Sequence, residues 1–186
     1  MKKTPIKKIR RIEGDDPEED IIRVFIEVPS FENFGRHLGE MERKAWDAQF
    51  DDPPDEGQFD YNLERLTVSC PEGMNWDKTL DARVDQFLVD WPKIRPRVLK
   101  EVFNLYKKIQ PEVRRIHDNP GAPFVLPEPA TPEVVADLFR VSGIYLQHDE
   151  TSIGIGGGCT WDLEHLWGVL LRDNNVVEVG GIDAVC

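Results

Sequence analysis

The chain has 186 residues, of which 40% are hydrophobic and 31% charged, and this profile predicts one soluble domain with its own core. No run of about 18 apolar residues exists, which excludes a membrane-spanning segment, and the N-terminus lacks the apolar stretch of a signal peptide. Three widely spaced cysteines (Cys70, Cys159 and Cys186) do not form a disulfide framework. These features predict a cytoplasmic protein.

The net charge of −12 is unevenly distributed. Residues 1–11 contain six basic and no acidic side chains, whereas residues 12–186 contain 17 basic and 35 acidic side chains, a net charge of −18. A body this acidic repels phosphate backbones, so nucleic-acid binding by it is not expected. It suits a basic protein partner, although plain solubility is the simpler interpretation. We expect residues 1–20 to be a charged, flexible segment and residues 21–186 to be a single domain.

The first half of the domain contains two predicted strands. Residues 21–28 are β-branched and apolar and end at a proline, and residues 63–70 show the same character. Between them, residues 40–50 have helical spacing of apolar side chains, and residues 51–60 are rich in proline and acid, which predicts a loop.

The middle of the chain is predicted to be helical. A first helix, capped by Asp77 or Thr79, carries an apolar stripe and is interrupted by Pro92 and Pro96. A second helix follows and is kinked or ended by Pro111. Thr131 and Pro132 then predict the start of a short helix that includes Leu138 and Phe139. The stripes consist of Val84, Phe87, Leu88 and Trp91 in the first helix and Val98, Val102, Leu105 and Ile109 in the second.

The last part of the chain changes to the period of strands. Four strands are predicted here, at residues 143–148, 151–159, 165–171 and 176–179. A hairpin turn is predicted at residues 172–175, because Asp and Asn tolerate positive φ. The predicted fold class is therefore α+β, with a β-rich N-terminal part, central helices and a C-terminal antiparallel meander.

The glycine cluster at residues 154–158 suggests a phosphate-binding loop but lacks both signatures of one. It is not followed by Lys-Ser/Thr, and it does not lie between a strand and a helix. We expect these glycines to permit a bulge or the close packing of a neighbouring ring.

The densest polar set is Asp162, Glu164 and His165, which Cys159 and His148 would join if adjacent strands pair. Such a set suggests a metal site or a general base, but no established ligand spacing supports it. The simpler interpretation is a turn at residues 161–165 held by local hydrogen bonds. We assign no catalytic residue, no metal ligand and no cofactor, and we keep the three residues as a candidate functional cluster.

The remaining cysteine, histidine and tryptophan residues are assigned structural roles. A Cys–His nucleophile at Cys159 is considered, but its apolar and acidic surroundings predict an unreactive buried thiol. His37 and His117 are expected on the surface. Trp46 is expected on an exposed helix face, and four other tryptophans are expected to be core anchors, namely Trp76, Trp91, Trp161 and Trp167.

The C-terminal part of the chain resembles the C-terminal part of an uncharacterised bacterial domain family. Two stretches carry the resemblance, namely residues 159–169 and the later run Val-Val-Glu-Val-Gly-Gly-Ile-Asp. The resemblance covers roughly residues 60–186, and Leu166 departs from it, since the family tends to have glycine there. The matching positions are Trp161, Asp162, Glu164, His165, Gly168, Gly180 and Asp183. The resemblance implies a fold type and no activity, while acidic members are reminiscent of immunity proteins that neutralise toxins.

Three hypotheses follow. The leading one is a non-enzymatic domain that binds a basic protein partner. The alternative is a hydrolase or metal-binding domain that uses Asp162, Glu164 and His165. In the third, residues 161–165 only support folding, and His165→Ala lowers stability by the usual 1–3 kcal/mol, roughly, of a lost buried polar partner.

Overall fold

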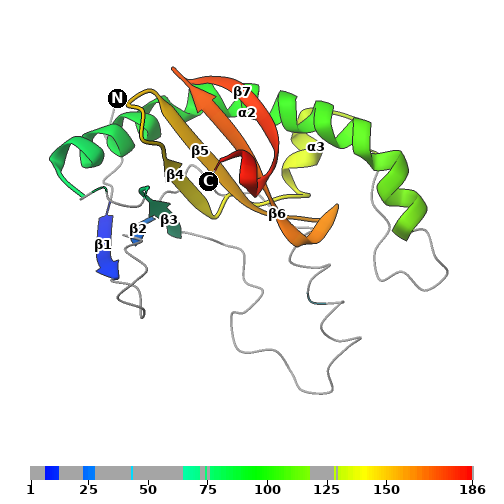
Figure 1. Ribbon diagram of the computed structural model, residues 1–186. Coiled ribbons are helices and arrows are strands. Elements are labelled where there is room, and N and C mark those ends of the chain that lie inside the picture. Colours follow the sequence, from blue (N-terminus) through cyan, green and yellow to red (C-terminus); the bar gives the residue numbers. More distant parts are fainter. Residues whose placement is uncertain are drawn as a thin grey trace.

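The computed structural model describes residues 7–12, 23–27, 43, 65–71, 74, 76–117, 128 and 130–185. Within them the chain forms a mixed β-sheet with helices on one face (Figure 1), so the α+β class is confirmed. In chain order the elements are β1 (Lys7–Ile12), β2 (Arg23–Glu27), β3 (Arg65–Ser69), α2 (Lys78–His117), α3 (Pro132–Ala136), β4 (Gly143–Leu146), β5 (Ser152–Cys159), β6 (Asp162–Arg172), β7 (Asn175–Gly181) and the 3-10 turn η2 (Ile182–Ala184).

The strands lie in the sheet in their sequence order, from β1 to β7. Neighbouring strands are antiparallel except β3 and β4, which are parallel and therefore need the crossover that α2 and α3 supply. From β4 to β7 the chain forms an antiparallel meander, as predicted. The hairpin turn between β6 and β7 also agrees with its prediction, since Asp173 and Asn174 have φ angles of 48° and 62°.

The central helix is continuous, so the prediction of two helices separated at Pro92 and Pro96 is wrong. α2 has 40 residues and contains both prolines as well as Pro111. All three side chains are exposed. A proline removes one backbone N–H and opens the helix on its own side, so prolines on the outer face bend the helix instead of ending it. Figure 1 shows α2 arching over the sheet.

Polar contacts hold the first turns of α2 in place. The Asp77 carboxylate accepts a hydrogen bond from the backbone N–H of Leu80 at 2.9 Å, which caps the helix as predicted. One turn further along, the Arg83 guanidinium donates to the backbone carbonyl of Gln147 at 3.1 Å and to that of Ser152. These bonds join the start of the helix to the turn between β4 and β5.

The core lies between α2 and the sheet. The apolar stripe of the helix, from Val84 to Tyr106, is buried in one cluster with the inward side chains of the strands. The Phe139 and Trp167 rings pack edge to face with centroids 4.4 Å apart. Trp91, Trp161 and Trp167 are buried and Trp76 is partly buried, which agrees with their predicted role as core anchors.

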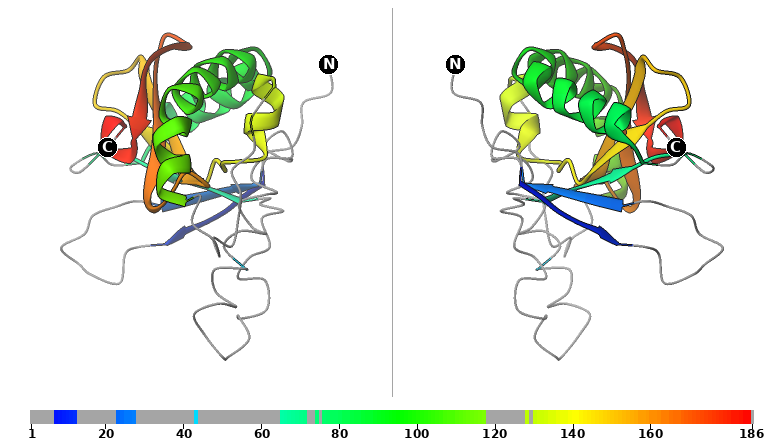
Figure 2. Two further views of the ribbon diagram at one scale, coloured as in Figure 1. Left: turned by 90° about the vertical axis from the view of Figure 1, so that its right-hand side faces the viewer. Right: turned by 90° about the vertical axis from the view of Figure 1, so that its left-hand side faces the viewer.

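The glycines of β5 form a floor for the end of the chain. Figure 2 shows η2 on the face of the sheet opposite α2. A β-carbon at Gly154 would lie 2.6 Å from Cβ of Val185, and one at Gly156 would lie 2.6 Å from Cδ1 of Ile182. The pairing of β5 with β6 is also irregular between Gly157 and Cys159, and the extra residues, 163–166, lie on β6. The cluster is thus a packing surface, and besides these aliphatic side chains the Tyr145 ring lies beside Gly156, at 3.5 Å from an added β-carbon, as expected.

The short helix α3 begins as predicted, with Thr131 at the N-cap and proline at the first position. It ends at Ala136, earlier than expected. The following backbone turns to pair with the end of β5, where Thr160 N–H donates to the carbonyl of Leu138 at 2.8 Å. Leu138 is therefore buried as part of this connection and not as part of a helix.

Several predictions lie outside the described residues, including the helix at 40–50, the loop at 51–60 and the placement of Trp46, His37 and the His117 side chain. β1 and β2 are strands, but the β-rich character of the whole N-terminal part stays a prediction, as does the division into residues 1–20 and 21–186. In the described part of the chain, no helix has the length and apolar character needed to cross a membrane.

Candidate functional site

The predicted cluster of Asp162, Glu164 and His165 lies at the start of β6. The predicted turn at 161–165 is shorter than expected, because Asp162 already pairs with Cys159 as a strand residue. The Asp162 carboxylate accepts a hydrogen bond from the backbone N–H of His165 at 3.0 Å and lies 3.0 Å from His165 Nδ1. The His165 and Asp162 side chains are 74% and 45% exposed. Together they form a local pair on the surface.

Cys159 lies next to Asp162, as expected, but His148 does not join the pair. His148 precedes β5 and Asp162 follows β5, and eight strand residues at about 3.3 Å each separate them by roughly 26 Å. The Glu164 side chain lies outside the described residues. Among the described side chains, no three His, Cys, Asp or Glu residues lie close enough to hold a metal ion. The geometry gives the hydrolase or metal-binding alternative no support.

Cys159 lies on the core side of β5 and is 1% exposed. Burial raises the pKa of its thiol to about 12, and Sγ donates a hydrogen bond to the backbone carbonyl of Asp162 at 3.4 Å. The thiol is therefore protonated at neutral pH, whereas the thiolate is the form that attacks an electrophile. Cys159 is suited to packing and unsuited to nucleophilic catalysis.

We expect His165→Ala to lower the free energy of unfolding by less than about 1 kcal/mol, because exposed ion pairs contribute little. This is less than the value expected for a buried partner, since His165 is largely exposed. Urea denaturation followed by circular dichroism measures the change. Asp162→Ala should cost more, since Asp162 also accepts the backbone N–H of His165. A loss above about 2 kcal/mol for His165→Ala would contradict the surface-pair interpretation.

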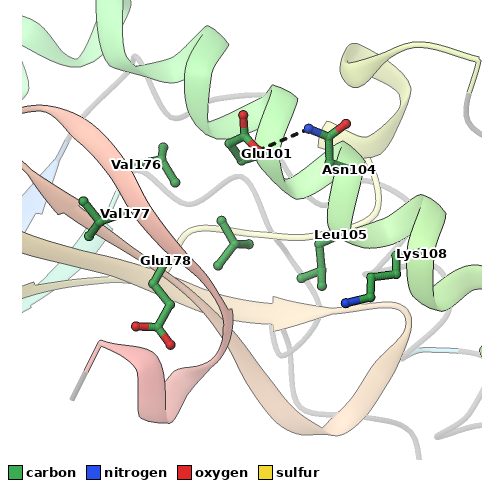
Figure 3. Close-up of a pocket in the computed structure, with 8 residues that line it drawn as sticks. Glu101, Asn104, Leu105, Lys108, Val176, Val177 and Glu178 are labelled. Carbon is green, nitrogen blue, oxygen red and sulfur yellow. Dashed lines mark hydrogen bonds between the residues drawn. The ribbon is translucent and has the colours of Figure 1, made fainter.

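A pocket of about 320 Å³ lies between the second half of α2 and strand β7, and we call it the α2–β7 groove. Figure 3 shows its lining, which comprises Glu101, Asn104, Leu105, Lys108, Val176, Val177, Glu178 and Val179. Leu105, Val176 and Val179 are half-buried, and Val177 is 51% exposed. The groove is open to solvent, and its lining mixes apolar and polar side chains.

Sequence reasoning missed the α2–β7 groove. Leu105 was assigned to the apolar stripe of a helix and residues 176–179 to a strand, both correctly. The sequence contained one signal for the groove: the spacing of positions 101, 104, 105 and 108 places them on one face of a helix. That this face borders β7 depends on how α2 crosses the sheet, and no local pattern contains that information.

The charge of the described part is segregated in a way that the overall composition hides. α2 contains ten basic and five acidic side chains, a net charge of +5. Residues 131–185 contain two basic and nine acidic side chains, a net charge of −7. The helix is therefore a basic element in an acidic protein, and the meander is acidic.

Comparison with known proteins identifies the family. The model of the domain of unknown function DUF6985 matches residues 37–186 of the chain. The chain belongs to the DUF6985 family. The expected membership of an uncharacterised domain family is confirmed, and the matched range contains Asp162, Glu164, His165 and the α2–β7 groove. No curated protein and no solved structure matches the chain. Membership of DUF6985 assigns no activity, so function has to be argued from the chain itself.

Proposed function

We propose that this protein is a non-enzymatic binding domain that captures a basic protein partner through acidic side chains of its C-terminal meander and η2. The observation that carries the proposal is a set of exposed carboxylates, which we call the acidic set and which consists of Glu150, Asp173 and Asp183. Among the described residues, no Lys, Arg or His nitrogen lies within 4.0 Å of these carboxylates. Such unpaired charges favour a partner of opposite sign through steering and complementarity.

The other parts of this proposal rest on the sequence. We place the protein in the cytoplasm, and we expect its folded part not to bind nucleic acid, because a net charge of −18 on residues 12–186 repels phosphates. The N-terminal part is proposed to be β-rich. An immunity-like role, in which the partner is a basic toxin, is an analogy with acidic proteins of that kind.

The test is affinity capture from native lysate at low and high salt, followed by mass spectrometry. Wild type should retain one stoichiometric basic partner at low salt and release it at high salt, because surface charges are screened. The variant Glu150→Gln/Asp173→Asn/Asp183→Asn removes three negative charges at nearly constant shape and should lose the partner. Asn at position 173 keeps the turn, since it tolerates the positive φ found there.

The matched control is Lys93→Gln/Lys100→Gln/Lys107→Gln, which neutralises three exposed side chains on α2. This control should retain the partner. Capture that survives high salt, or that the acidic-set variant preserves, would show that the acidic set does not recognise the partner. The absence of any stoichiometric partner would contradict the proposal as a whole.

A further inference from the structure

The α2–β7 groove borders β7, one of the two edge strands of the sheet in the described part of the chain. β7 is the last strand and pairs only with β6, and among the described residues no backbone hydrogen bond reaches its outer edge. An unpaired edge presents N–H and C=O groups that an extended peptide can pair with. The bulge in the β6–β7 pairing leaves Val177 without a partner, so the regular part of the edge begins at Glu178.

The apolar floor of the groove is suited to an aliphatic side chain. Leu105 of α2 and Val176 and Val179 of β7 are half-buried, and the two valines pack against the core. A volume of about 320 Å³ accommodates a few side chains and not a folded partner. A peptide strand on the edge of β7 would direct alternate side chains toward this floor.

The cation of the groove is Lys108. Its side chain is exposed, and Figure 3 shows it extending over the pocket, whereas the carboxylate of Glu178 points away from α2. Among the described residues, no carboxylate oxygen lies within 4.0 Å of Lys108 Nζ. Glu101 accepts a hydrogen bond from the Asn104 amide at 3.1 Å. The lining therefore contains two carboxylates, one bonded to Asn104 and one directed away from α2 (Figure 3), and an ammonium group without a carboxylate partner on a helix of net charge +5.

We propose that the α2–β7 groove binds an extended peptide segment that carries an aliphatic residue beside an acidic one. The peptide adds a strand to the edge of β7, its aliphatic side chain packs on Leu105, Val176 and Val179, and its carboxylate pairs with Lys108. This site is separate from the acidic set and recognises the opposite charge, so the inference does not rest on the proposed basic partner.

Phage-displayed random dodecapeptides, selected on the full-length wild-type protein, test the proposal. Enriched peptides should carry Asp or Glu next to Val, Ile or Leu and lack proline in that stretch. Lys108→Glu should weaken their binding by at least about tenfold, because it replaces attraction with like-charge repulsion. Lys93→Glu makes the same charge change on the same helix outside the groove and should bind within about threefold of wild type.

Two further measurements separate strand pairing from simple charge attraction. Methylating alternate amide nitrogens of the best peptide should abolish binding, because the ladder hydrogen bonds are lost, and NMR amide shifts on titration should concentrate in β7. The proposal is overturned if no peptide is enriched, if both lysine variants weaken binding equally, or if the methylated peptide still binds. A dimer of the protein alone that Lys108→Glu dissociates would instead assign the groove to a second copy.

Discussion

Trp167→Ala is expected to lower the free energy of unfolding by about 3–5 kcal/mol, the usual cost of truncating a fully buried tryptophan. Trp167 is 1% exposed, and its ring packs edge to face on Phe139. Its Nε1 donates a hydrogen bond to the backbone carbonyl of Arg140 at 2.9 Å, which ties β6 to the connection before β4. The substitution removes the packing and this bond together. Urea denaturation followed by circular dichroism measures the loss.

The control for this prediction is the preceding residue of β6. Leu166 is 41% exposed, because neighbouring strand residues point to opposite faces. Leu166→Ala should therefore change the free energy of unfolding by no more than about 1 kcal/mol. If both variants lost the same amount, Trp167 would not be the anchor that its burial indicates.

Gly157→Ala is expected to cost about 3 kcal/mol or more, the upper end of what overpacking does in a core. A β-carbon at this position would lie 2.3 Å from the backbone oxygen of Arg140 and 2.9 Å from the backbone nitrogen of Ser142. Backbone atoms cannot rotate away as the end of a side chain can. These neighbours belong to the connection that pairs with β5, where Ser142 N–H donates to the carbonyl of Gly156 at 2.8 Å. The extra methyl group therefore separates hydrogen-bonded backbone segments.

Gly181→Ala is the matched control for Gly157→Ala. The nearest atom to its added β-carbon is the backbone oxygen of Leu166 at 3.9 Å, which is an ordinary contact, and its φ of −71° suits any residue. We expect this variant to differ from wild type by no more than about 0.5 kcal/mol in a thermal or urea unfolding experiment. A cost for Gly157→Ala no larger than that of the control would disprove the close backbone approach.

The C-terminal meander was predictable because its signals are local. Alternating apolar residues place Trp167, Val169 and Leu171 on the core face, and all three are buried. The Asp173–Asn174 turn follows from residues that tolerate positive φ. Thr131 and Pro132 marked the start of α3 for an equally local reason.

The prolines of α2 and the candidate cluster at β6 were harder to interpret. A proline inside a helix costs a hydrogen bond wherever it lies, but Pro92 and Pro96 are exposed, so they bend α2 without entering the core. His165 lies on the surface and not in the interior because β6 begins at Asp162 and carries its side chain outward. In both cases the structure depends on which face of the helix or strand the rest of the fold covers. The order of residue types along the chain does not determine which face that is.

The sequence by itself determined that this protein is an α+β domain with an acidic body, a C-terminal antiparallel meander and inward-facing aromatic anchors. Periodicity, turn chemistry and charge are properties of short stretches of chain, so they can be recognised without coordinates. Only the tertiary structure decided that α2 is one helix, that the glycines of β5 support Ile182 and Val185, and that Lys108 lies beside β7. Each of these features depends on which face of an element the rest of the fold covers, and the last two join segments that are distant in sequence.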